Sequence, residues 1–210
     1  MDNKKFVIIE NLFFGMIVVA SFVLTILLHL SYLSFVACAT SIIYIVFLSE
    51  KNILNFFVGF ASSVTYIMVA YTSKLYGEAL FYLVVDIPLI FVSFFMWRKH
   101  METKLIVKTK KLSYKSIIII SIISILLTVG YGFILKLVGD VNPFVDALST
   151  VATCIATFLM MTRYREQWIM WIIVYVISIV LWITTFDLLM LIMSISCLIS
   201  SIIGFIKWSR

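Results

Sequence analysis

Hydrophobic residues fill eight long blocks of this 210-residue chain, and short polar stretches separate the blocks. A helix needs about 20 apolar residues to cross a hydrocarbon core of about 30 Å, and backbone polar groups in lipid must bond within their own segment. None of the blocks alternates as the strands of a membrane barrel do. The pattern therefore predicts an all-α integral membrane protein of about eight transmembrane helices. The predicted spans are residues 7–30, 32–48, 53–71, 79–97, 116–137, 144–161, 168–186 and 188–207.

The composition leads to the same class of protein. Apolar residues make up 64% of the chain and charged residues 12%, and the mean hydropathy is +1.19. A soluble domain has about 25% charged residues, so solubility is excluded. The first block is longer than the apolar region of a signal peptide and no small-residue cleavage site follows it. We therefore expect residues 7–30 to remain as a helix.

The positive charges are distributed unevenly between the predicted faces. Eight crossings place both termini and the loops at residues 49–52, 98–115 and 162–167 on one side, and only Lys74 and Lys136 of the 16 Lys and Arg residues fall on the other. The positive-inside rule then predicts cytoplasmic termini in a plasma (inner) membrane protein. The net charge of +6 follows from this topology and does not indicate nucleic-acid binding. We interpret the basic residues at 104–115 as a linker that contacts anionic lipid.

The predicted helices form two similar groups of three. Residues 32–97 end in Trp97-Arg98, residues 144–208 end in Lys207-Trp208, and each group contains a short charged turn after its first helix. The segment 98–138 holds the basic linker and one connecting helix, so both groups enter the membrane in the same direction. This order predicts a three-plus-one-plus-three parallel repeat, with residues 7–30 as an additional helix. Such a core encloses a path for a small molecule.

Polar residues inside the spans are candidates for a site, because intramembrane polar groups usually face the bundle interior. Asp86 lies in mid-span, two residues before Pro88, which we expect to kink the helix. Asp86 either lines a cavity or is a structural carboxylate bonded to a neighbouring helix. Ser62, Tyr66 and Tyr82 are the other candidates in the first group of helices.

The second group of helices offers a carboxylate, hydroxyl groups and an aromatic stripe. Asp146 follows Pro143 in the first turn of a helix, where it is either a cap or part of a site. Further along that helix are Thr150, Thr153 and Thr157, at helical spacing that also suits close packing. The stripe comprises Trp168, Trp171, Tyr175, Ser178 and Trp182, and Ser200 follows in the last span. Aromatic faces bind flat rings, and cationic rings additionally through cation–π attraction, although Trp168 also fits an interfacial belt.

Enzymatic and metal chemistry find little support in the sequence. The two His residues are solitary and no phosphate-binding glycine loop is present, so we expect no enzyme activity and no cofactor. Cys38, Cys154 and Cys197 lie in predicted spans without paired spacing, and we interpret them as packing residues.

One stretch carries a resemblance to a known family. The run TRYREQWIMW at residues 162–171, followed by VISIV at 176–180, resembles the PnuC-type nicotinamide riboside transporters, which are vitamin and nucleoside facilitators with SWEET-like parallel repeats. Residues 76–78, 146–151 and 204–208, with Pro88, support the resemblance. It implies the three-plus-one-plus-three core, facilitated diffusion of a vitamin precursor, and trapping of the product by a separate cytoplasmic kinase. The partners expected are membrane lipid, a small-molecule substrate and, in a homo-oligomer, a second copy of the chain.

The chain departs from the family pattern where the substrate would be recognised. Family members tend to carry side-chain amides at positions where this chain has Ser62, Tyr82, Ile90, Tyr175 and Ser200. An amide offers a donor and an acceptor, so its loss alters which substrate fits. Thiamine, riboflavin and deoxynucleosides therefore stay open as alternatives to nicotinamide riboside. An accessory membrane protein with a decayed site also stays open.

Overall fold

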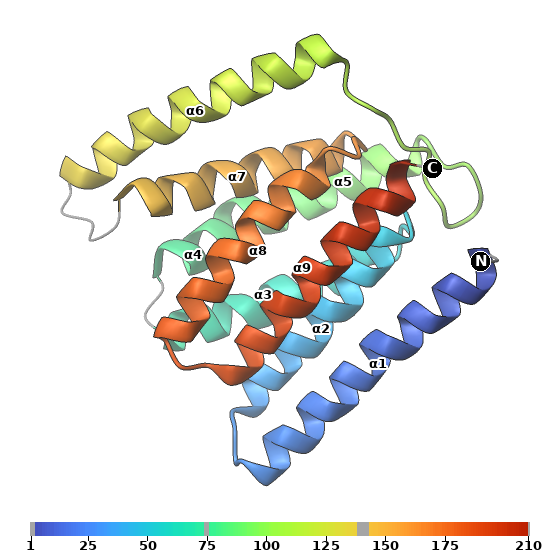
Figure 1. The fold of residues 1–210 in the computed structure, drawn as a ribbon, viewed down its shortest axis with the longest axis vertical. Helices are drawn as coiled ribbons and strands as arrows, with labels where there is room; N and C mark the ends of the chain where they lie inside the picture. The colour runs from blue at the N-terminus through green and yellow to red at the C-terminus, as the bar shows by residue number, and fades with distance from the viewer. Residues whose placement is uncertain (1–2, 74–75, 138–142, 210) are drawn as a thin grey trace.

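The computed structural model describes residues 3–73, 76–137 and 143–209, and the regular structure in these ranges is helical (Figure 1). The helices pack side by side as eight rods, because α4, the π-helical turn η1 and α5 run on as one rod. Their bounds are α1 Asn3–Leu27, α2 Tyr32–Ser49, α3 Asn55–Thr72, α4 Tyr76–Phe81, η1 Tyr82–Asp86, α5 Ile87–Arg98, α6 Tyr114–Leu137, α7 Pro143–Met161, α8 Gln167–Thr184 and α9 Leu188–Ser209.

The rods confirm the all-α membrane fold that the hydropathy predicts, with bounds that differ by a few residues. Within the described ranges, seven helices are long and apolar enough to cross a membrane. The remaining rod is α3, which has 18 residues but carries several hydroxyl groups that lower its hydropathy. It packs against α2 along the bundle in the place of the predicted third span.

The helix packing interlocks two triplets, α2 to α5 and α7 to α9. Helix α9 packs on α2 and α5 packs on α7, so the last helix of each triplet lies against the first helix of the other. Helix α1 lies at one edge of the bundle against α2, while α6 lies at the opposite edge and packs mainly on α7 (Figure 1). The space between the triplets is therefore bordered by α2, α3, η1, α7, α8 and α9.

One end of the bundle, which we call the basic end, carries most of the described positive charge. It holds the first turn (residues 50–54), the loop at residues 99–113 and the second turn (residues 162–166). Helix α1 begins there and α9 ends there (Figure 1). Lys136 lies at the end of α6, at the opposite end of the bundle. Lys74 and Arg210, which the charge count includes, lie outside the described residues.

The two turns at the basic end have the same geometry. Lys51 and Arg163 both adopt left-handed backbone, with φ of 61° and 67°. The Lys51 N–H donates to the Leu48 carbonyl at 3.0 Å, and the Arg163 N–H donates to the Met160 carbonyl at 2.9 Å. Burial lowers the pKa of both the Lys51 and the Arg163 side chain from their ordinary values.

A segment of the loop, residues 105–112, lies across both turns, and we call it the strap. Ile106 pairs antiparallel with Asn52 of the first turn, and Lys110 pairs parallel with Tyr164 of the second. The Val107 N–H donates to the Lys51 carbonyl at 3.0 Å, and the Lys110 N–H donates to the Arg163 carbonyl at 2.8 Å. The strap therefore connects the basic ends of the two triplets through backbone hydrogen bonds.

Tryptophans beneath the strap make a second set of matched contacts. The Trp97 indole N–H donates to the Met160 carbonyl at 3.0 Å, and that of Trp208 donates to the Leu48 carbonyl at 3.3 Å. Each bond joins the last helix of one triplet to the first helix of the other. The Trp208 ring lies 5.9 Å from the Trp97 ring and 5.8 Å from the Trp168 ring, and all three residues are buried. This tryptophan cluster fills the core at the basic end.

Helix α1 is attached to the basic end through polar contacts. Glu10 is buried and forms an ion pair with Lys207 of α9. The Lys207 ammonium also donates to the Ser49 hydroxyl at 3.3 Å, and Asn11 donates to Glu50 at 3.3 Å. The additional helix is therefore held by both triplets.

Candidate functional site

Two small cavities lie between the triplets, on either side of the Tyr66 and Tyr82 rings. The ring centroids of Tyr66 and Tyr82 are 4.4 Å apart, and both residues line both cavities. The Asp86 cavity has a volume of about 40 Å³. Its lining is Ser41, Tyr44, Ser62, Ser63, Tyr66, Tyr82, Asp86, Trp171, Tyr175, Met193 and Cys197. The Glu78 cavity has a volume of about 60 Å³ and is lined by Tyr66, Glu78, Phe81, Tyr82, Ser149, Thr150, Thr153, Val174 and Ser178.

The Asp86 cavity combines a carboxylate with aromatic rings. The Ser63 hydroxyl donates to Asp86 Oδ2 at 2.6 Å. The Trp171 and Tyr175 rings stack with centroids 5.8 Å apart and an angle of 23° between their planes. The Trp171 indole N–H is buried without a hydrogen-bond partner among the described residues. A flat ring bearing an acceptor would meet both an aromatic wall and a free donor here.

The Glu78 cavity is richer in hydroxyl groups. The Tyr66 hydroxyl donates to Glu78 Oε2. Thr150, Thr153 and Ser149 come from α7, and Ser178 comes from α8. The Thr153 hydroxyl donates to the Ser149 carbonyl at 2.8 Å, which leaves its oxygen lone pairs available to a ligand. The lining suits a ligand that carries several hydroxyl groups.

The π-helical turn explains how one helix serves both cavities. The Ile87 N–H donates to the Tyr82 carbonyl five residues earlier, and Pro88 has no N–H to continue the α-helical ladder. Residues eight apart on an α-helix are rotated by about 80° around its axis. The wider π turn underwinds the helix between Glu78 and Asp86, which brings the two carboxylates towards the same face. The irregularity at Pro88 therefore takes the form of a local π turn.

The structure brings most of the predicted site residues together. Ser62, Tyr66, Tyr82, Asp86, Trp171 and Tyr175 line the Asp86 cavity. Thr150 and Ser178 line the Glu78 cavity. The Ser62 hydroxyl of α3 and the Ser41 hydroxyl of α2 form a hydrogen bond with an oxygen–oxygen distance of 2.7 Å.

Three predicted residues do not line either cavity. Trp182 is fully buried behind Tyr66, with an edge-to-face contact at 5.9 Å. Ser200 is fully buried one turn beyond Cys197, and its hydroxyl has no partner among the described residues. Asp146 is exposed at the start of α7, where it interacts electrostatically with Glu78.

Several lining residues are absent from the sequence prediction. Ser41 and Tyr44 share a face of α2 at a spacing of three, and Met193 and Cys197 share a face of α9 at a spacing of four. Isolated Tyr, Met and Cys residues in an apolar span give no signal that separates a cavity from ordinary packing. Glu78 was visible in the sequence, but the predicted span begins one residue after it. In the structure its side chain lines the cavity and accepts a hydrogen bond from Tyr66.

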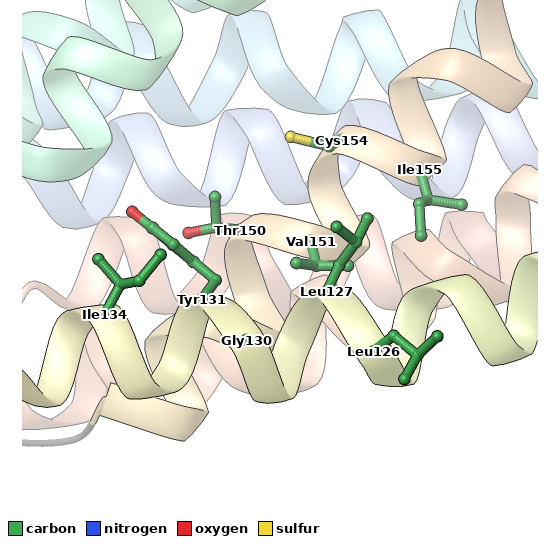
Figure 2. Close-up of a pocket in the computed structure, with 9 residues that line it drawn as sticks. All are labelled: Leu126, Leu127, Gly130, Tyr131, Ile134, Thr150, Val151, Cys154 and Ile155. Carbon is green, nitrogen blue, oxygen red and sulfur yellow. The ribbon is translucent and has the colours of Figure 1, made fainter.

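A larger hollow lies elsewhere, in the groove between α6 and α7. Its volume is about 520 Å³. Figure 2 shows the residues that line it: Leu126, Leu127, Gly130, Tyr131 and Ile134 from α6, and Thr150, Val151, Cys154 and Ile155 from α7. The lining is apolar except for two hydroxyl groups and a thiol. A polar ligand would lose its hydrogen bonds to water there without replacement, so the smaller cavities are the better candidates.

Metal chemistry is not indicated in the part of the chain that the structure describes. No group of three or more His, Cys, Asp or Glu side chains there could hold a metal ion. Cys38, Cys154 and Cys197 are free thiols, of which Cys38 and Cys197 are buried.

A helical membrane bundle that holds a polar and aromatic site between two interlocked triplets has the architecture of a small-molecule transporter. The comparisons agree, because the family model described as nicotinamide mononucleotide transporter matches residues 31–210. The chain belongs to this family of membrane transporters.

Individual relatives match over most of the chain. The nicotinamide riboside transporter PnuC of Neisseria mucosa is 36% identical over 192 residues, which cover 86% of this chain and 73% of the relative. PnuC of Haemophilus influenzae is 31% identical over 183 residues, covering 86% and 80%. A crystal structure of the vitamin B3 transporter PnuC superposes with a TM-score of 0.87 at 33% identity, covering 96% of this chain and 90% of that one. The resemblance seen in the sequence is thereby confirmed.

Proposed function

We propose that this protein carries nicotinamide riboside, or a closely related nucleoside-like or vitamin precursor, across the membrane by facilitated diffusion. The relatives that match it are named for nicotinamide riboside, which supports this substrate. The basic end faces the cytoplasm, in agreement with the excess of positive charge there. A cytoplasmic kinase traps the product as a phosphate ester.

The cavity lining favours a riboside over the mononucleotide that the family description names. The two cavities contain the carboxylates of Asp86 and Glu78, and no Lys, Arg or His is among their described lining residues. A mononucleotide carries a phosphate with about two negative charges, which two nearby carboxylates would repel. The described lining offers no cationic partner for a phosphate, and this observation favours the riboside over the mononucleotide.

The matched contacts at the basic end support a parallel repeat. Leu48 with Met160, Lys51 with Arg163, and Trp97 with Trp208 occupy corresponding places in the two triplets. The strap pairs antiparallel with one turn and parallel with the other, as expected when an axis along the membrane normal relates the turns. Both cavities lie between the triplets, where rocking of one triplet against the other would expose them alternately.

Uptake into vesicles that contain only the purified protein tests this function. Labelled nicotinamide riboside should equilibrate across the membrane, while labelled nicotinamide mononucleotide should stay outside. Thiamine, riboflavin and deoxynucleosides in the same assay cover the alternatives. Folded protein that admits none of these compounds would contradict the proposal and favour an accessory role.

Trapping needs a separate arm of the experiment. Vesicles loaded with a riboside kinase and ATP should accumulate label above the external concentration, whereas vesicles without the kinase should only reach it. Equal accumulation in both would contradict the proposed trapping.

A further inference from the structure

The two cavities differ in chemistry, and the difference matches the two halves of a riboside. Around the Asp86 carboxylate lie five aromatic side chains, those of Tyr44, Tyr66, Tyr82, Trp171 and Tyr175. The negative faces of such rings attract a cation, and enclosure by several rings is how proteins bind groups that have a positive charge but no N–H to donate. The pyridinium ring of nicotinamide riboside is a group of this kind.

The charge of Asp86 has no positive counterpart in the described part of the chain. The ion pairs found there are Arg165 with Glu166 and Lys207 with Glu10, both at the basic end. Asp86 accepts a hydrogen bond from the Ser63 hydroxyl, which carries no charge. An ionised carboxylate is costly to remove from water unless an opposite charge approaches it. A cationic ring in the Asp86 cavity would supply that charge.

The Glu78 cavity has the chemistry expected for a sugar. Ser149, Thr150, Thr153 and Ser178 bring hydroxyl groups to it, and the Glu78 carboxylate accepts hydrogen bonds only. Ribose hydroxyls donate and accept, so they can pair with both kinds of group. Fewer aromatic rings face this cavity, and those that do include Tyr66 and Tyr82, which separate it from the Asp86 cavity.

We propose, on the basis of the proposed function, that Asp86 and the rings around it bind the positively charged ring of the substrate while the Glu78 cavity binds its sugar hydroxyls. The substrate class is then a compound with a planar cationic ring joined to a small polyhydroxyl group. Asp86 determines specificity for the positive charge of the substrate ring. Glu78 contributes affinity that does not depend on that charge.

The two small cavities must merge for such a compound to fit. A water molecule occupies about 30 Å³ in the liquid, so spaces of 40 and 60 Å³ hold one or two waters each. The Tyr66 and Tyr82 rings form the partition between them. Displacement of this pair joins the two spaces, and the glycosidic bond of the substrate takes the place of the rings.

A pair of ligands that differ only in charge tests the assignment. Benzamide riboside has a carbon atom where nicotinamide riboside has the ring nitrogen, so it keeps the shape, the carboxamide and the sugar but loses the positive charge. Competition against labelled nicotinamide riboside in vesicles gives the affinity ratio of the two compounds. The variants are Asp86→Asn, Glu78→Gln and, as a control at the exposed loop, Glu102→Gln.

Wild-type protein and Glu102→Gln should prefer the cation by about tenfold, since a desolvated cation gains both ring and carboxylate contacts. Asp86→Asn should reduce this preference to about twofold, from the rings alone. Glu78→Gln should weaken binding of both ribosides while leaving their ratio unchanged.

Other results would overturn the assignment of the ring and the sugar to the two cavities. A different result would overturn the proposed function. Equal affinity for the two ribosides in wild-type protein rejects the charge preference while transport stands, and this test needs no variant to fold. The placing of the cationic ring beside Asp86 is rejected if folded Asp86→Asn keeps the wild-type affinity ratio of the two ribosides. It is also rejected if Glu78→Gln changes this ratio more than Asp86→Asn does. If neither riboside is taken up, the proposed function fails and the assignment fails with it.

Discussion

The two triplets make matched contacts at the basic end of the bundle, whereas their residues differ in the middle of the bundle. At the basic end the contacts are matched: Trp97 and Trp208 donate equivalent bonds, and Lys51 and Arg163 adopt equivalent backbone. In the middle, residues at corresponding positions differ in chemistry. Counting the same number of residues back from Trp97 and Trp208 leads to Asp86 in one triplet and Cys197 in the other.

The same contrast holds along α3 and α8. Counting forward equally from Lys51 and Arg163 pairs Gly59 with Trp171, Ser63 with Tyr175 and Tyr66 with Ser178. The carboxylates of the site come from the first triplet, whereas its indole ring comes from the second. The ends share one structural task and have kept matched residues. The substrate proposed for the middle of the bundle has no internal symmetry, and a symmetric lining would fit it poorly.

The largest expected effect concerns the orientation of the ends. Reporter fusions after Lys108 and after Arg210 should both report cytoplasm, because all but two of the Lys and Arg residues fall on that side of an eight-helix topology. The signal is all or none. A periplasmic signal at either position would remove the basis for comparing the two triplets as parallel units.

Loss of a tryptophan at the basic end should destabilise the fold strongly. Trp97→Ala and Trp208→Ala each remove a buried ring and a hydrogen bond between triplets, so each should cost about 3 to 5 kcal/mol. Thermal unfolding in detergent should show similar losses for the two variants. Trp97→Phe and Trp208→Phe are the matched controls, which keep most of the ring. A large drop for one Trp→Ala variant alone would contradict the equivalence of the ends.

In the middle of the bundle, Trp171 and Trp182 should separate binding from packing. Trp171→Ala should weaken substrate affinity by about 1 kcal/mol from lost stacking, with a further loss from the removed apolar area. Trp171→Phe should keep much of the affinity. Trp182 lies behind Tyr66, so Trp182→Ala should lower thermal stability more than affinity. Unchanged affinity in folded Trp171→Ala would show that the stacked rings are a packing feature.

The smallest expected effect is that of collapsing ion gradients. Facilitated diffusion needs only the substrate gradient, so vesicle uptake should continue at its initial rate when proton and sodium gradients are removed. Asp86 accepts a hydrogen bond from Ser63 and Glu78 accepts one from Tyr66, so separate hydroxyl groups bind the two carboxylates. Uptake that stops under these conditions would assign the two carboxylates to ion coupling.

The number and position of the spans could be predicted from the sequence, while the shape of the site could not. Hydropathy located the spans because lipid imposes length and apolarity on each helix separately. The spacing of the aromatic residues on α8 places them on one face of the helix. The spacing does not predict where along the helix the cavity ends. Trp171 therefore lines it, whereas Trp182, three turns further, meets Tyr66 instead. The π turn depends on how α4 and α5 pack, and Pro88 alone predicts only an irregularity.

The strap sets a limit on how the basic end can move. Val107 is bonded to the first turn and Lys110 to the second, and three residues of extended chain reach at most about 11 Å. While both attachments hold, the two turns cannot move further apart than this tether allows, although they can rotate around it. Wider separation requires release from one turn, which breaks backbone hydrogen bonds and, at the first turn, also exposes the buried Val107 side chain. The loop therefore acts as a tether, and its length between Val107 and Lys110 sets the widest opening of the basic end before one attachment is released.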